Sequence, residues 1–226
     1  MTRMWLILVM VAACGGKKDK APEAHETSPP TAPAAKAASP AAEFWRWFST
    51  NAAALRADKD LRHTMDAISK ELEKVHPGVF AEIGGDGDNR TLVLSVDGKK
   101  ELFPAVQELY AARPTVSGWT IVAFRQRAKP GDPALTIELG DRKLDPKLVK
   151  VVATPAADKK LDIVVFIPGF TTNEEMGQLG FVILDHVVGE YDMETRIAGV
   201  DFAPLEKAPA EAKPLDTLPT MVDALK

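Results

Sequence analysis

The sequence predicts an α+β fold in which helices pack on a mainly antiparallel sheet. Several segments carry apolar residues three or four positions apart, a spacing typical of helices packed on one side. Short runs rich in Val, Ile and aromatic residues, bounded by Gly and Pro, are typical of strands. The strand-like runs follow one another in groups between the helices, and such grouping favours antiparallel pairing.

The first residues predict export. Arg3 precedes an apolar stretch from Met4 to Ala13, and small residues lie directly before Cys14. A positive start, an apolar middle and a small-residue cleavage site are typical of a secretory signal. The stretch is about half the roughly 20 apolar residues that a membrane span needs. The run that ends in Cys14 resembles a bacterial lipobox, so we expect residues 1–13 to be a lipoprotein signal peptide.

Cys14 is the expected lipidation site. Plain secretion is the alternative, but it would leave the only cysteine of the chain as a free thiol. A diacylglyceryl group, usually joined by an N-linked palmitate or similar chain, anchors lastingly because each buried methylene contributes about 0.8 kcal/mol. Gly15 stands where an aspartate retains lipoproteins of enteric bacteria at the inner membrane. We therefore expect attachment to a membrane of the cell envelope, and the outer one in a Gram-negative source.

Residues 14–42 are expected to form a disordered, lipid-anchored tether. Ala, Pro, Lys, Glu, Ser and Thr dominate this segment, and it contains no aromatic residue. Such a composition cannot recover the entropy of ordering by burying apolar surface, and its prolines favour extended conformations. His25, which lies between glutamates, is expected to be solvated rather than bound to a metal.

Residues 43–226 are expected to form a single α+β domain. Five of the 28 basic residues and three of the 32 acidic residues precede residue 43, which leaves 23 basic and 29 acidic residues and a net charge of −6. Binding to a phosphate backbone requires a basic patch. We therefore expect no nucleic-acid partner.

The first half of this domain is expected to begin with two helices. Aromatic residues at positions 44, 45, 47 and 48 open the first helix and are expected in the core, with a sugar or peptide platform as the alternative. Asp60 is expected to cap the second helix, 60–75. The elements expected next are strands 79–83 and 91–96, a helix 101–112 and a strand 119–124. The Gly- and Asp-rich loop 84–89 is expected to be a turn, because a calcium loop would need a glutamate at a spacing that is missing here.

The second half is expected to contain further strands and one long helix. The most apolar run, 161–167, is expected to be a central strand. The other expected elements are strands 135–139 and 149–153, a helix 173–188, a strand 194–202, and a tail 204–226 that can dock one helical turn through Met221, Val222 and Leu225.

The densest polar group lies at the end of the long helix and the start of the last strand. Its members are Asp185, His186, Glu190, Asp192 and Glu194. Carboxylates beside a histidine can bind a divalent metal or perform acid–base catalysis. A solvated helix end, at which His186 compensates the negative end of the helix, is the other interpretation. Gly189 is expected to end the helix, and Asp192 and Glu194 are expected to share one face of a strand.

Other catalytic patterns are missing from the sequence. There is no Gly-x-Ser-x-Gly elbow and no His-Glu-x-x-His motif, and lipidation would consume the only cysteine. Arg125 and Arg127 can hold an anion or can simply alternate in exposure along a strand end. No cofactor is expected.

Six short motifs in this order resemble a bacterial family of α+β proteins catalogued as a domain of unknown function. They are Phe44-Trp45-x-Trp47-Phe48, Val75-His76-Pro77-Gly78, Leu94-Ser95-x-Asp97-Gly98, Phe103-Pro104-Ala105-Val106, Trp119-x-x-x-Ala123-Phe124-Arg125 and Leu184-Asp185-His186-x-x-Gly189-Glu190-Tyr191-Asp192-x-Glu194-Thr195. The resemblance spans most of residues 43–202 and implies a single domain with a shared surface at residues 189–194. It implies no activity, and the lipobox departs from the cytoplasmic form in which the family often occurs.

The sequence therefore favours a lipid-anchored envelope module that binds a protein or peptide and is not an enzyme. One alternative is a metal-dependent or acid–base hydrolase that uses the polar cluster at residues 185–194. Another is an envelope immunity or inhibitor protein whose acidic domain binds a toxin with a positive surface.

Overall fold

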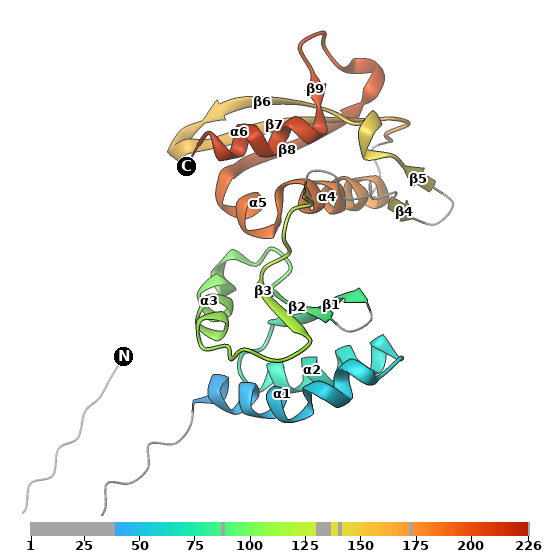
Figure 1. The fold of residues 1–226 in the computed structure, drawn as a ribbon. Coiled ribbons are helices and arrows are strands. Elements are labelled where there is room, and N and C mark those ends of the chain that lie inside the picture. Colours follow the sequence, from blue (N-terminus) through green and yellow to red (C-terminus); the bar gives the residue numbers. More distant parts are fainter. Residues whose placement is uncertain (1–38, 87–88, 130–136, 140–141, 172–173, 226) are drawn as a thin grey trace, which may run out of the picture. The chain divides into compact units, whose positions relative to one another are not determined.

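The computed structural model describes residues 39–225 except 87–88, 130–136, 140–141 and 172–173 (Figure 1). Residues from Ala38 onward form one compact unit. The expected signal peptide, Cys14 and most of the expected tether lie outside the described residues. Within the described part of the chain, no helix is both long and apolar enough to cross a membrane.

The first half contains three helices and three strands, as the sequence predicted (Figure 1). In chain order they are α1 (Pro40–Ala57), α2 (Leu61–Glu73), β1 (Phe80–Asp86), β2 (Asn89–Ser95), α3 (Phe103–Ala111) and β3 (Trp119–Ala123). α1 begins at Pro40 with Ser39 as its N-cap, so the last residues of the expected tether belong to its first turn. The Asp60 side chain caps α2 by accepting hydrogen bonds from the backbone nitrogens of Arg62 and His63.

The second half contains the remaining strands and helices. In chain order they are β4 (Ile137–Leu139), β5 (Arg142–Leu144), β6 (Lys150–Ala156), β7 (Lys160–Ile167), α4 (Glu174–Val188), α5 (Glu190–Arg196), β8 (Ile197–Pro204), β9 (Lys213–Pro214) and α6 (Leu218–Asp223). Short 3-10 helices lie at Lys100–Leu102, Pro146–Leu148, Ala157–Lys159, Leu205–Lys207 and Leu215–Thr217. α6 contains Met221 and Val222, where the sequence predicted a helical turn.

The two larger sheets share one topology. β1 and β2 form an antiparallel hairpin, a helix follows, and β3 returns parallel to β2 in the order β1-β2-β3. β6 and β7 likewise form an antiparallel hairpin, α4 and α5 follow, and β8 returns parallel to β7 in the order β8-β7-β6-β9. Each half is thus a ββαβ unit, and β4 and β5 form a separate antiparallel pair.

Pairing within the sheets is mostly antiparallel, as predicted, because the paired strands of each hairpin are separated by only a few residues of the chain. The two parallel pairs each enclose a helical connection, which parallel strands require. β7 lies between β6 and β8, so the prediction that the most apolar run is a central strand is confirmed.

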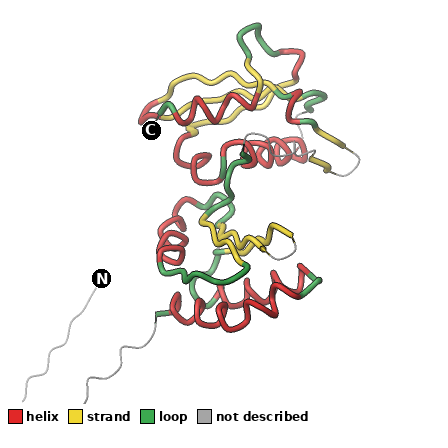
Figure 2. Tube along the Cα trace, viewed as in Figure 1, coloured by secondary structure: helices red, strands yellow, loops and turns green. Residues whose placement is uncertain are grey.

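Each half has its own hydrophobic core. Figure 2 shows that both halves consist of helices and strands. In the first core, Phe44, Trp45 and Phe48 of α1 are buried against the β1–β3 sheet, so these aromatic residues are core rather than a binding platform. The Trp45 indole N–H donates to the Leu109 carbonyl at 2.8 Å, which satisfies its polar atom inside the core. The second core gathers buried residues of β6, β7, α4 and α6, among them Val165, Ile183 and Leu218.

One predicted element is wrong. Asp192 and Glu194 were expected on a strand, but they lie in α5, and β8 begins only at Ile197. Gly189 ends α4 with φ +87°, as predicted, and the chain then starts a second helix. Two acidic residues in the first turn, Glu190 and Asp192, favour this because they face the positive end of the helix dipole.

Candidate functional site

The polar cluster predicted from the sequence lies where the two cores meet, and its centre is Glu190. This side chain is fully buried, with 0 % of its surface exposed. Its Oε1 accepts hydrogen bonds from the backbone nitrogens of Val96 at 3.0 Å and Gly98 at 3.2 Å, and its Oε2 accepts one from that of Arg125 at 3.1 Å. Three donors compensate much of the cost of burying a carboxylate, and they tie α5 to the first half of the chain.

The segment after β3 is bound to the end of α4 by backbone hydrogen bonds. The Glu190 nitrogen donates to the Arg125 carbonyl at 3.0 Å, and the Ala128 nitrogen donates to the His186 carbonyl at 2.8 Å. A Cβ on Gly189 would lie 3.0 Å from the Arg127 nitrogen, so this close approach, together with φ +87°, requires glycine. We call this region, residues 95–98, 124–128 and 185–191, the junction.

Arg125 is the cation of the junction. Its Nε donates to Glu82 at 2.6 Å, its Nη1 to Asp185 at 2.8 Å and its Nη2 to Asp97 at 2.8 Å. Burial lowers the pKa of Arg125, but hydrogen bonds to Asp97, Glu82 and Asp185 outweigh this effect and raise it above the ordinary value. The guanidinium therefore connects a strand of the first half, the turn after β2 and α4 of the second half.

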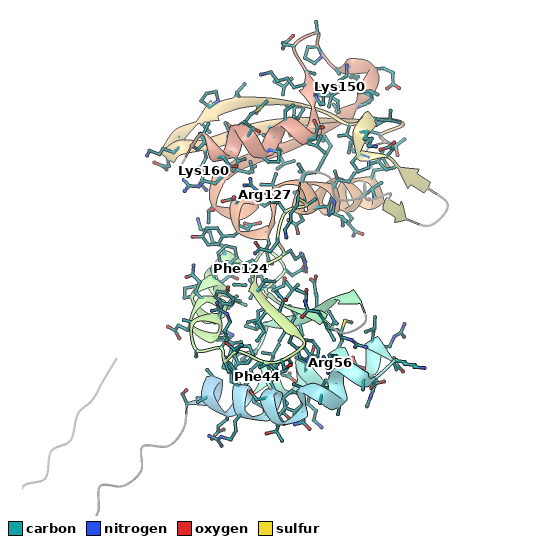
Figure 3. The ribbon with its side chains drawn as sticks, in the orientation of Figure 1. Phe44, Arg56, Phe124, Arg127, Lys150 and Lys160 are labelled. Carbon is teal, nitrogen blue, oxygen red and sulfur yellow. The ribbon has the colours of Figure 1, made fainter. Side chains whose placement is uncertain are left out.

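Aromatic contacts extend the junction. The Tyr191 ring of α5 stacks on Phe103 at a centroid distance of 5.5 Å and lies 5.3 Å from Phe124. Phe124 has φ +63°, a left-handed conformation that is unusual for a bulky residue. Its nitrogen donates to the Leu94 carbonyl at 2.8 Å, and its ring lies 4.5 Å from Phe103. Contacts with the Phe103 and Tyr191 rings hold the strained residue in place at the end of β3, where Figure 3 labels Phe124.

Two carboxyl groups have raised pKa values: Asp185 of the junction and Glu194 of α5, which lies beside it. Burial raises the pKa of Asp185, and the hydrogen bond to Arg125 opposes this shift without cancelling it. Burial also raises the pKa of Glu194, and the neighbouring charge of Asp185 adds to the shift, whereas Lys100 opposes it. Both shifts come mainly from loss of solvent.

The structure places the five predicted site residues in different roles. Glu190 and Asp185 bind the first half of the chain, whereas His186 contributes its backbone carbonyl. Gly189 separates the helices, so His186 and Glu190 do not form a pair one turn apart on one helix. Within the described ranges, no group of three or more His, Cys, Asp or Glu side chains is placed to hold a metal ion.

Arg125 and Arg127, predicted as candidates for anion binding, pair with carboxylates of the chain itself. The Arg127 guanidinium lies 2.8 Å from Asp223 of α6, and this hydrogen bond raises the pKa of Arg127. The spacing in the sequence revealed neither pairing, because Asp223 and Arg127 are 96 residues apart. The junction is therefore mainly an internal set of polar contacts, in which the buried Nη1 of Arg127 is left without a hydrogen-bond partner among the described residues.

A second feature, which the sequence did not reveal, is an apolar surface on α4. Phe181 and Val182 are each 50 % exposed. The Phe181 ring meets Phe202 of β8 edge-on at 5.2 Å, and Phe170 lies 6.0 Å from Phe202. We call Phe170, Phe181, Val182 and Phe202 the α4 patch.

Comparison of this chain with protein-family models, with curated proteins and with solved structures finds no match.

Proposed function

We propose that this protein is a lipid-anchored module of the bacterial cell envelope and that its folded part binds a protein or peptide partner. The α4 patch carries this proposal. Large apolar side chains with half of their surface in solvent, gathered beside further aromatic rings, are typical of protein interaction sites. Phe181 supplies a rigid aromatic anchor of the kind that contributes most to binding energy at interfaces.

The contacts of Glu190 and Asp185 support a structural role for these two residues over a catalytic one. A catalytic carboxylate must reach the atom that reacts. The Glu190 carboxylate is fully buried and accepts from three backbone nitrogens, and Asp185 is bound to Arg125. These groups hold the two halves of the chain together, which is the role that their contacts support.

The anchor in this proposal rests on the sequence around Cys14. In this proposal, the Ala- and Pro-rich segment that follows Cys14 keeps the folded part close to the membrane that holds the lipid. A partner in the same envelope would therefore meet the folded part at a high effective concentration. Such a module needs only modest affinity to hold its partner.

Site-specific photocrosslinking in cells tests the binding role. A benzophenone amino acid replaces Phe181 in the full-length protein, and the matched control replaces Leu61 of α2, which is 47 % exposed and also apolar. We expect a discrete crosslinked protein from position 181 and none from position 61. Crosslinking at neither position, or equally at both, would contradict the proposal.

A further inference from the structure

We propose that β8 is the docking strand of this module, and that an extended partner segment of alternating apolar and basic residues adds to its outer edge. This inference rests on the proposed function and specifies how the partner is held. β8 runs from Ile197 to Pro204, and its neighbour in the sheet is β7. Within the described residues, no strand pairs with its other side. An edge strand presents unpaired backbone donors and acceptors to any chain that can lie beside it.

The α4 patch lies along this edge. The register pairs Phe202 with Val165, a buried core residue, so Phe202 points to the face of the sheet that α4 covers. A Cβ on Gly180 would clash with the Phe202 ring, which shows how closely α4 approaches β8. Phe181 is the next residue of α4, is half exposed and contacts the same ring. An added strand would thus find an aromatic surface for the side chains on that face.

The opposite face of the edge carries two carboxylates, Asp201 of β8 and Asp162 of β7, and Lys160 lies on the same face of β7 two residues before Asp162. Asp201 is paired in register with Val164, and Asp162 with Gly199, so both carboxylates lie on the face away from Phe202. Both residues are exposed. The eight residues of β8 contain one acidic residue and no basic residue. Because side chains of a strand alternate between faces, the edge favours a partner with apolar residues toward Phe181 and basic residues toward Asp201.

The other sheet edges are less suited to this role. β3 has five residues and β9 has two. β1 contains two consecutive glycines, and its exposed aromatic residue, Phe80, has the Lys99 ammonium over its ring at 5.5 Å. β8 alone among these edges combines eight residues with an exposed aromatic side chain, Phe181, on a neighbouring helix.

A designed peptide tests the strand addition. The probe is a fluorescent peptide of eight residues that alternates Lys and Val, and its binding to residues 39–226 is followed by fluorescence anisotropy in low salt. We expect saturable binding of the Lys/Val peptide. A Glu/Val peptide should bind about tenfold more weakly, because Lys side chains attract the Asp201 carboxylate across the strands whereas Glu side chains repel it. The Lys/Val peptide with every backbone nitrogen methylated should not bind, since it cannot form the ladder.

Paired variants separate the edge from general electrostatics. Asp201→Lys should weaken binding of the Lys/Val peptide about tenfold. Asp66→Lys changes the net charge equally at an exposed site on α2, and it should change the affinity less than about twofold. Phe181→Ser should weaken binding, but Leu61→Ser should not. On binding, hydrogen exchange should slow in residues 197–204 and remain unchanged in β3.

The outcomes distinguish this inference from the proposed function. Crosslinking from position 181 in cells without peptide binding, or with binding that tolerates backbone methylation, would overturn strand addition and leave the binding role in place. A Phe181-dependent dimer in analytical ultracentrifugation would assign the edge to a second copy and would also overturn it. If position 181 gives no crosslink and the peptide does not bind, both proposals fail.

Discussion

The Glu190 carboxylate accepts a hydrogen bond at 3.0 Å from the backbone nitrogen of Val96, which lies 94 residues earlier in the chain. The acceptor belongs to α5 and the donor to the turn after β2, so this bond joins the two ββαβ halves. With the bonds from Gly98 and Arg125, it uses both carboxylate oxygens in a fully buried position. Glu190 is therefore a structural residue of the junction.

Glu190→Gln should destabilise the fold. The amide keeps the shape of the side chain but loses the charge, and one of its two ends is a donor that would face backbone N–H groups. Hydrogen bonds to charged groups contribute about 1.5–3 kcal/mol, so we expect a loss of about 2 kcal/mol in urea unfolding. Glu206→Gln, at an exposed site, should stay within about 0.5 kcal/mol. Equal midpoints for the two variants would show that the junction contributes little.

Glu194→Gln should change the pH dependence of stability. Burial raises the folded-state pKa of Glu194 above its unfolded value, so the folded state binds more protons between the two values. The native protein therefore loses stability as pH rises from the unfolded pKa through the folded one. The variant lacks this loss, and its melting temperature should exceed that of the native protein by about 1–3 °C at pH 7 and by less at pH 4. A difference in melting temperature that stays the same from pH 4 to pH 7 would contradict a raised pKa for Glu194.

Arg125→Lys should destabilise the protein more than Arg127→Lys does. Arg125 donates through three nitrogens to three carboxylates, and a lysine ammonium on a flexible stem cannot reproduce that fork. Because 29 % of the Arg125 side chain is exposed to solvent, we expect Arg125→Lys to lower the free energy of unfolding by about 1 kcal/mol. Arg127 has one carboxylate partner, Asp223, at the surface, so its variant should lose less than about 0.5 kcal/mol. Chemical denaturation of both proteins compares the two directly.

Two glycines of α4 should respond to alanine in opposite directions. Among the described residues, no atom beyond the chain neighbours and the helix's own backbone lies within 4 Å of a Cβ placed on Gly177, so Gly177→Ala should stabilise the helix by about 0.5–1 kcal/mol. A Cβ on Gly180 meets the Phe202 ring, and Gly180→Ala should cost about 1–3 kcal/mol because the ring must move. Thermal unfolding measures the stability of both variants. A stabilising effect of Gly180→Ala would show that the Phe202 ring can move away from α4 at little cost.

Cys14→Ser should remove the membrane anchor. The serine hydroxyl does not replace the thiol that the lipid transfer modifies, so the variant should stay unprocessed or leave the detergent phase in Triton X-114 partition. Metabolic labelling with an alkyne fatty acid should mark the native protein and not the variant. A variant that still partitions with membranes would mean that something other than Cys14 holds the chain there.

Local patterns predicted most elements of the fold. Asp60 was identified as a cap because its side chain acts within one helical turn. The β1–β2 hairpin and the central position of β7 followed from apolar runs and turn residues. These features depend on interactions between residues that are close in the sequence, so a local stretch of sequence is enough to predict them.

The features that were missed depend on distant residues. The sequence marked Glu190 as part of a polar cluster, but nothing near it indicated that Val96 would be its donor. The sequence left Arg125 as either an anion ligand or a residue of alternating exposure, and the structure pairs it with Asp185, 60 residues later. The left-handed φ of Phe124 is imposed by packing at the junction, because its own side chain disfavours that conformation.

The repeated ββαβ topology has a consequence for folding kinetics. The hairpins β1–β2 and β6–β7 pair residues close in sequence, whereas the junction closes loops of 60 to 94 residues. Loop-closure entropy rises with length, so each half is expected to collapse on its own before α5 brings its carboxylate into place. Contacts that form only after the folding transition state affect the unfolding rate and not the folding rate. Loss of the Glu190 carboxylate should therefore accelerate unfolding and leave the refolding rate nearly unchanged.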